Sequence, residues 1–123
     1  MNQDLLKELQ DIVRQRKQEH EEGSYTAYLF DQGLDKVLKK LGEESAETII
    51  AAKNLAAARE SGLDFDEAKT ALEGEAGDML FHFVVMLDIL GLDVDEVENL
   101  LRERMKKKGN LKVSLRGASD TRP

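Results

Sequence analysis

Apolar residues recur every three to four positions along most of this chain, which is the period of an amphipathic helix. Near the N-terminus, Leu5, Leu9 and Ile12 follow this spacing and predict a helix from about Asp4 to His20. No stretch of any length alternates between apolar and polar residues, as a half-buried strand would. The pattern therefore predicts an all-α fold, and helices joined by short connections are typical of an antiparallel bundle.

Turn and capping residues predict where the other helices begin and end. Asp93 and Glu96 form a D-x-x-E capping box, which opens a last helix. After residue 108 the periodicity fades, so we expect one domain over residues 1–108 and a mobile tail over residues 109–123. The predicted helices run from Ser24 to Gly33, from Asp35 to about Arg59, from Asp64 or Asp66 to Leu90, and from Asp93 to about Lys107.

Composition and charge restrict the possible partners. The absence of cysteine excludes a disulfide framework and any thiolate metal site. Residues 1–101 hold 10 Lys and Arg against 23 Asp and Glu, whereas residues 102–123 hold 8 against 2. Such an acidic body would repel a phosphate backbone, so we expect no nucleic-acid partner. The uncharged stretch from Met79 to Leu87 is far too short to cross a membrane, and we expect a cytoplasmic protein with no membrane partner.

The segment from Lys39 to Asn54 places several glutamates close together on one helix. At roughly 100° per residue, Glu43, Glu44 and Glu47 share one face. The same stripe holds two lysines at one end and an amide at the other, contributed by Lys36, Lys40 and Asn54. A cluster of this kind is most often a solvated helix face with ion pairs between its own residues, so a functional interpretation needs a second observation.

The following helix provides that observation. Glu75, Asp78 and His82 lie on one side of a helix that is apolar nearly all round from Met79 onward. We expect this helix to be buried, and buried carboxylates are costly unless a cation pairs with them. Two facing acidic clusters without cysteine suit a hard divalent cation, Mg²⁺ or alternatively Mn²⁺. His82 is more often a hydrogen-bonded core residue than a metal ligand in such a position.

These residues resemble a known family. The pattern K-x-x-E-E-x-x-E at residues 40–47, followed after 27 residues by E-x-x-D at residues 75–78, is similar to that of the all-α nucleotide pyrophosphohydrolases related to MazG. More specifically, SYTAYLFDQGLDKVLKKLGEESAETIIAAKN and GEAGDMLFH resemble the phosphoribosyl-ATP pyrophosphohydrolases of histidine biosynthesis. The resemblance covers roughly residues 5–105. It implies Mg²⁺-dependent hydrolysis of phosphoribosyl-ATP to phosphoribosyl-AMP and pyrophosphate by a homodimer.

The resemblance also implies roles for individual residues. The expected metal ligands are Glu44, Glu47, Glu75 and Asp78. The expected catalytic residues are Glu43, Glu44, Glu47 and Lys40, with Glu43 joining the metal ligands or polarising the attacking water. The expected substrate-binding residues are Ser24, Tyr25, Thr26, Lys36, Lys40 and Asn54.

Two other functions remain compatible with the sequence. A housekeeping pyrophosphohydrolase for ordinary or damaged nucleoside triphosphates needs the same acids. A non-enzymatic helical interaction module explains the amphipathic helices, but not Glu75 and Asp78 on an apolar helix. Gly74 and Gly77 flank Glu75 where better helix formers are expected, and we expect them to permit a close approach between helices.

Overall fold

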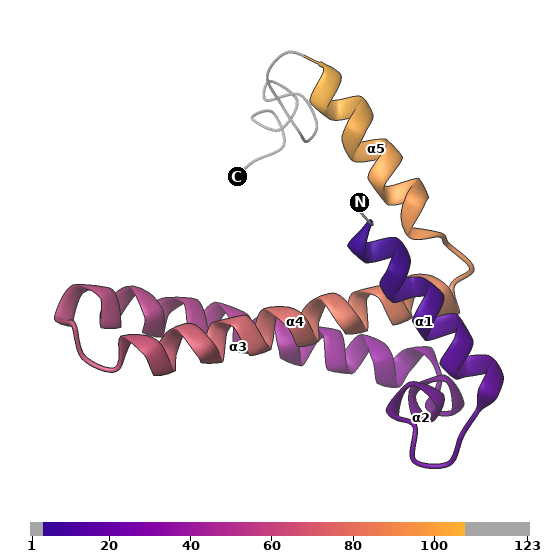
Figure 1. The fold of residues 1–123 in the computed structure, drawn as a ribbon, viewed down its shortest axis with the longest axis horizontal. Coiled ribbons are helices and arrows are strands. Elements are labelled where there is room, and N and C mark those ends of the chain that lie inside the picture. Colours follow the sequence, from indigo (N-terminus) through magenta and orange to yellow (C-terminus); the bar gives the residue numbers. More distant parts are fainter. Residues whose placement is uncertain (1–3, 108–123) are drawn as a thin grey trace. The chain divides into compact units, whose positions relative to one another are not determined.

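A computed structural model describes residues 4–107, which form α-helices without any strand (Figure 1). The predicted all-α class is therefore confirmed. The helices are α1 (Leu5–Glu19), α2 (Tyr25–Gln32), α3 (Leu34–Ser61), α4 (Phe65–Ile89) and α5 (Val94–Lys106). The chain divides into two compact units, one up to Leu92 and one from Asp93 onward. The predicted tail at residues 109–123 lies outside the described residues.

Local capping interactions explain where the helices begin and end. The Ser24 hydroxyl accepts a hydrogen bond from the Ala27 amide at 3.1 Å, and α2 begins at the next residue, as predicted. Gly62 ends α3 in the left-handed conformation, with φ of 76°, and its amide donates to the Ala58 carbonyl at 2.8 Å. These caps satisfy backbone groups that have no partner inside the helix.

Gly33 joins α2 to α3 without an intervening loop. Its amide donates to the Leu29 carbonyl at 2.9 Å and ends α2, while the same residue is the N-cap of α3. Its φ of 92° is a conformation that side-chain-bearing residues rarely adopt. The single glycine therefore fixes the path of the chain between the segment that begins at Ser24 and the acidic stretch of α3.

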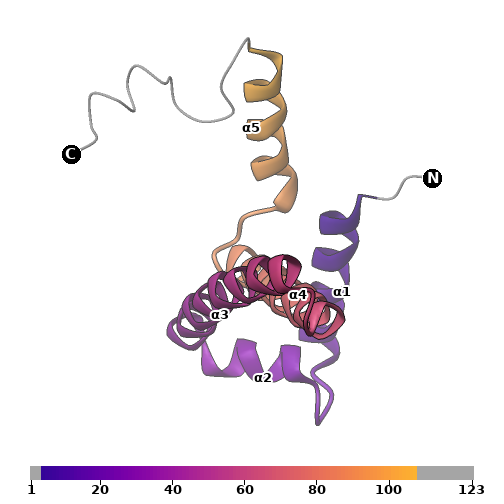
Figure 2. The ribbon, with the colours of Figure 1, turned by 90° about the vertical axis from the view of Figure 1, so that its left-hand side faces the viewer.

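Helices α3 and α4 form a long antiparallel hairpin (Figure 1). Helix α1 packs against α4, and α2 packs against both α1 and α3, so α2 lies under one end of the hairpin (Figure 2). The core of this first unit lies at that end, where apolar side chains from all four helices are almost completely inaccessible to solvent. The most buried of these residues are Val13, Leu29, Val37, Val84 and Val85.

The structure bears out one prediction about α4 only in part and contradicts another. The helix is buried only over its C-terminal part, which begins near His82, while Leu80 is 42% exposed. The reason is that α1 and α2 cover only one end of the hairpin (Figure 1). A methyl group added at Gly74 or Gly77 would meet no atom within 4 Å, so these glycines do not permit a close helix approach.

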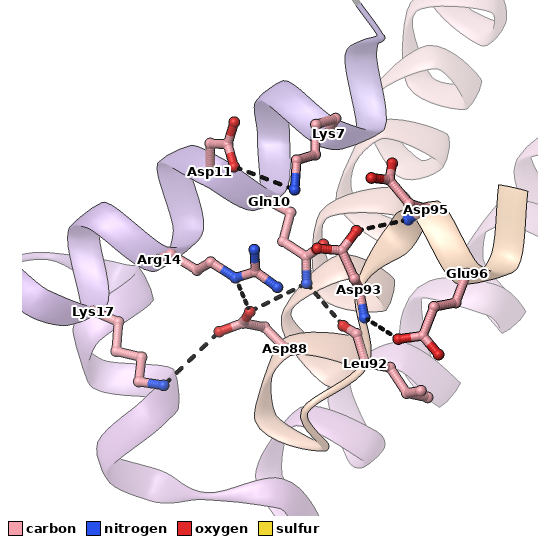
Figure 3. Close-up of polar contacts among 10 residues, drawn as sticks. All are labelled: Lys7, Gln10, Asp11, Arg14, Lys17, Asp88, Leu92, Asp93, Asp95 and Glu96. Carbon is pink, nitrogen blue, oxygen red and sulfur yellow. Dashed lines mark hydrogen bonds and ion pairs between the residues drawn. The ribbon is translucent and has the colours of Figure 1, made fainter.

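Helix α5 belongs to the second unit. The Asp93 carboxylate accepts from the Asp95 amide at 2.8 Å, and the Glu96 carboxylate accepts from the Asp93 amide at 3.2 Å (Figure 3). These bonds form the predicted capping box. Among the residues described, no helix has the length and apolar character needed to cross a membrane.

Candidate active site

Three carboxylates from the two arms of the hairpin meet at one place. Glu44 and Glu47 come from α3 and Glu75 comes from α4, and one oxygen of each lies within 4.8 Å of the others. We call these three residues the acidic cluster. Asp78 lies outside this group, although its charge is close enough to act on Glu44. The antiparallel hairpin therefore brings together three of the four predicted metal ligands and places the fourth beside them.

Glu44 is the most perturbed member of the acidic cluster. Its Oε1 atom is inaccessible to solvent and has no hydrogen-bond partner. Burial raises the pKa of this carboxyl to about 7, and a hydrogen bond shared with Glu75 and the charges of Asp78, Glu47 and Glu75 add to the shift. A carboxylate that is desolvated and surrounded by like charge favours a bound proton or a bound metal cation.

The predicted burial of the acidic residues is wrong for this chain. Glu43, Glu47 and Asp78 are exposed, and Glu44 and Glu75 are half-buried. The residues of the acidic cluster are therefore not enclosed in a core, although one oxygen of Glu44 is inaccessible to solvent. Desolvation of Glu44 together with the proximity of like charges distinguishes this site from an ordinary solvated helix face.

The predicted lysines lie near the acids without neutralising them. Lys40 Nζ is 3.9 Å from Glu43 Oε1, and Lys36 Nζ lies 5.9 Å from the centre of the Tyr28 ring. Within residues 4–107, no ion pair reaches the acidic cluster or Asp78. Its negative charge is therefore left without a positively charged protein partner.

A hydrogen-bonded histidine, His82, connects the predicted segment from Ser24 to Thr26 with helix α4. The Tyr25 hydroxyl is 2.9 Å from His82 Nε2, and His82 Nδ1 is 2.9 Å from the Asp78 carbonyl. Both ring nitrogens are occupied, and His82 is buried, in agreement with its interpretation as a hydrogen-bonded core residue. Thr26 is also buried, and Ser24 caps α2.

Burial raises the pKa of Tyr25 above its usual value. Lys40 opposes this shift, while Tyr28, Glu44 and Asp78 add to it, so the phenol lies within the electrostatic reach of both the lysine and the acids. The structure thus brings Tyr25 to the edge of the acidic cluster.

Asn54 is not brought to the acidic cluster. It is exposed and lines a different cleft, of about 650 Å³, near the turn between α3 and α4. Ten residues of helix separate it from Glu44, which corresponds to roughly 15 Å along the axis. A shared face on a helical wheel does not make two residues neighbours when their axial separation is this large.

The sequence analysis missed a second polar site on α4. Asp88 is buried, and its carboxylate accepts from Arg14 Nε at 2.7 Å and from Gln10 Nε2 at 3.1 Å, while Lys17 Nζ is 3.9 Å away (Figure 3). Gln10 also donates to the Leu92 carbonyl at 2.9 Å. An aspartate inside the apolar run FVVMLDIL was the available signal, because such a residue requires a cationic partner.

The donors of the acidic cluster fit a hard divalent cation. Oxygen ligands alone are available, the converging oxygens are close enough to share one ion, and Glu44 Oε1 is buried without a partner. A cation would replace the proton that the raised pKa of Glu44 favours. The arrangement suits chemistry on an anionic substrate whose charge must be neutralised, such as a polyphosphate.

Known proteins are similar to this chain over most of its length. The family described as phosphoribosyl-ATP pyrophosphohydrolase matches residues 6–105. A phosphoribosyl-ATP pyrophosphatase of Pelotomaculum thermopropionicum is 43% identical over 105 residues, covering 85% of this chain and 95% of the relative. One of Clostridium novyi is 38% identical over 115 residues, covering 94% of each. The histidine biosynthesis bifunctional protein HisIE of Bacillus subtilis is 42% identical over 100 residues, covering 81% of this chain but 42% of the relative.

Proposed function

Because this chain belongs to the phosphoribosyl-ATP pyrophosphohydrolase family, we propose that it hydrolyses phosphoribosyl-ATP to phosphoribosyl-AMP and pyrophosphate during histidine biosynthesis. The bond broken is the anhydride between the α- and β-phosphates, and water supplies the oxygen of the new phosphate. The structural observation that supports this reaction is the acidic cluster, whose three carboxylates converge inside the matched residues and form no ion pair with any cation of residues 4–107.

We propose that Glu44, Glu47, Glu75 and Asp78 hold Mg²⁺, with Mn²⁺ as an alternative. When bound, the cation would neutralise the triphosphate and stabilise the negative charge that develops on its oxygens. In this proposal the four carboxylates on two antiparallel helices would bring the reacting phosphates to the acidic cluster through the bound cation. Asp78 requires only a small adjustment to join a group that its charge already influences.

The remaining polar residues of the site have separate roles. Lys36 and Lys40 lie at the N-terminal end of the acidic stripe, where they would pair with phosphate oxygens. Glu43 is exposed beside Lys40 and would accept a hydrogen bond from the attacking water. A carboxylate with ordinary access to solvent can accept such a proton and return it to water.

A substrate panel tests this proposal. Purified protein with Mg²⁺ should release pyrophosphate from phosphoribosyl-ATP much faster than from ATP, GTP or deoxynucleoside triphosphates. Comparable turnover of the common triphosphates would instead identify a housekeeping pyrophosphohydrolase. No turnover of any nucleotide would favour a non-enzymatic interaction module.

We propose further that the active protein is a homodimer located in the cytoplasm. Large apolar side chains remain exposed on both arms of the hairpin, with Ile49 at 66% and Ile50 at 59% on α3. An apolar cleft of about 340 Å³ lies between the arms, lined by Leu41, Ser45, Met79, Leu80 and Phe83. A second copy offering the same surface would cover these residues. Light scattering at micromolar concentration should return twice the mass of one chain, and the mass of a single chain would refute the dimer.

A further inference from the structure

Helix α2 exposes two aromatic rings beside the candidate active site. Tyr25 is 45% exposed and Tyr28 is 42% exposed, although rings of this size usually bury most of their surface. Their centroids lie 6.0 Å apart with an angle of 25° between the ring planes, so the two rings are stacked on each other and leave their remaining surface exposed. The sequence analysis identified Tyr25 but not Tyr28.

Contacts with His82 and Phe81 hold the Tyr25 ring in its orientation. His82 Nδ1 lies 2.9 Å from the Asp78 carbonyl, which can only accept, so Nδ1 carries the hydrogen. In the neutral imidazole Nε2 is then the acceptor, and the Tyr25 hydroxyl donates to it at 2.9 Å. Phe81 packs against the same ring, with centroids 6.0 Å apart. The aromatic surface is therefore held in place before any ligand arrives.

Basic and acidic side chains lie at different places around the two tyrosine rings. Lys36 lies over the Tyr28 ring at 5.9 Å, and the phenol of Tyr25 is within reach of the charges on Lys40, Glu44 and Asp78. Aromatic rings, basic side chains and a candidate cation site thus lie side by side in one compact unit. These are the three kinds of group that recognise the base, the phosphates and the metal of a nucleotide.

We propose that Tyr25 and Tyr28 form the surface on which the purine base of the substrate stacks. This assignment rests on the proposed function, because it requires a nucleotide substrate whose phosphates lie at the acidic cluster. Every base presents an aromatic face, and an exposed ring held in a fixed orientation binds such a face with little loss of conformational entropy.

A cleft next to Tyr28 bears on how a bound nucleotide would be oriented across the two tyrosines. This cleft has a volume of about 330 Å³ and is lined by Tyr28, Ser24, Glu21 and Glu22, and by Asp31, which is paired with His20 at 2.9 Å. Carboxylates repel phosphates but accept hydrogen bonds from the N–H groups of a purine. The triphosphate would therefore lie away from this cleft, toward Lys36 and Lys40.

Steady-state kinetics with phosphoribosyl-ATP test the role of Tyr28. Tyr28→Leu should raise KM about fivefold or more, since fivefold is the low end of what base stacking contributes, while kcat changes by less than about twofold. Tyr28→Phe keeps the ring and should retain a KM within about threefold of the native value. Phe30→Leu is the matched control, because Phe30 is an aromatic residue of the same helix that lies under Lys17 rather than in the pair.

Intrinsic fluorescence gives a test that does not depend on turnover. The chain has two tyrosines and no tryptophan, so fluorescence excited near 280 nm reports on Tyr25 and Tyr28 alone. Phosphoribosyl-AMP, the product that retains the base, should quench this signal in a saturable manner. Ribose 5-phosphate, which lacks the base, should not.

The possible results separate this inference from the proposed function. Hydrolysis of phosphoribosyl-ATP without quenching by its product, or an unchanged KM in Tyr28→Leu, would overturn the stacking surface and leave the function intact. Saturable quenching by ATP without any hydrolysis of phosphoribosyl-ATP would support the stacking surface and refute the proposed function.

Discussion

Helix α4 takes part in two groups of charged residues that are neutralised in different ways. Near its C-terminal end, the buried carboxylate of Asp88 is paired with Arg14 and Lys17 of α1. Nearer its middle, Glu75 faces other carboxylates of α3, and no described cation pairs with it. The protein completes the first group by itself and leaves the second to be completed from solution. The group without a described cationic partner is therefore the one that we propose to be functional.

The largest expected effect is on catalysis. Replacing Glu75 by Gln should lower kcat by more than about a hundredfold, because even residues that only orient metal ligands cost 10- to 100-fold when replaced. Glu73→Gln is the matched control, since Glu73 is on the same helix but pairs with Lys69 at 2.9 Å. Circular dichroism of both variants should match that of the native protein. Near-normal turnover of Glu75→Gln would place the metal elsewhere.

Magnesium should stabilise the fold through the acidic cluster. Binding to the folded state alone raises the free energy of unfolding by about 2.7 kcal/mol at one hundred times Kd. The measurement compares thermal unfolding in EDTA with unfolding in millimolar Mg²⁺. The increase in Tm should disappear in Glu44→Gln and persist in Glu73→Gln. Equal melting of the native protein in both buffers would contradict the metal site.

Asp88 should show the opposite behaviour. Asp88→Asn removes the charge that Arg14 and Lys17 face and should lower the free energy of unfolding by about 1.5–3 kcal/mol, the range for hydrogen bonds to charged groups. Urea unfolding measures this loss. The Mg²⁺-dependent increase in Tm and the kcat of the folded variant should both stay near native values. A variant that lost its response to Mg²⁺ would show that the two groups are coupled.

The smallest expected effect is a pH dependence of the metal-free protein. Because the pKa of Glu44 rises from 4.5 to about 7 on folding, the folded state holds more protons between these values. This contribution to stability is complete below pH 4.5 and is lost as the pH rises through 7.

The measurement compares the native protein with Glu44→Gln in EDTA. Between pH 5 and pH 8, the Tm of the native protein should fall relative to that of the variant by about 4–8 °C, the shift that about 1 kcal/mol produces in a domain of this size. A Tm difference that does not change with pH would show that Glu44 does not titrate in this range.

Local signals were enough to predict the elements of the fold. Ser24, Gly33 and Gly62 act within one turn of the backbone, so their effects can be recognised without knowledge of distant contacts. The convergence of Glu44, Glu47 and Glu75 was also predictable, because helix phase and antiparallel pairing together determine which faces meet.

Properties that depend on which helix covers which surface were not predictable in the same way. The exposure of Asp78 and Leu80 follows from where α1 and α2 end along the hairpin, and nothing local to α4 encodes it. Tyr28 was missed because its importance arises from Tyr25, three residues away, and from Lys36 on the next helix. Asn54 lies roughly 15 Å along the axis from Glu44, because helical phase gives a shared face but no distance along the helix.

The antiparallel hairpin has a consequence for how this chain can change in length. Residues inserted into one arm between the acidic motif and the turn rotate everything beyond them by about 100° each and shift it along the axis, which separates the carboxylates. Equal insertions of about seven residues, close to two turns, in both arms preserve phase and register together. The number of residues between the two acidic motifs can therefore vary when both arms lengthen equally by about two turns. A single insertion in one arm would move the carboxylates of α3 away from those of α4.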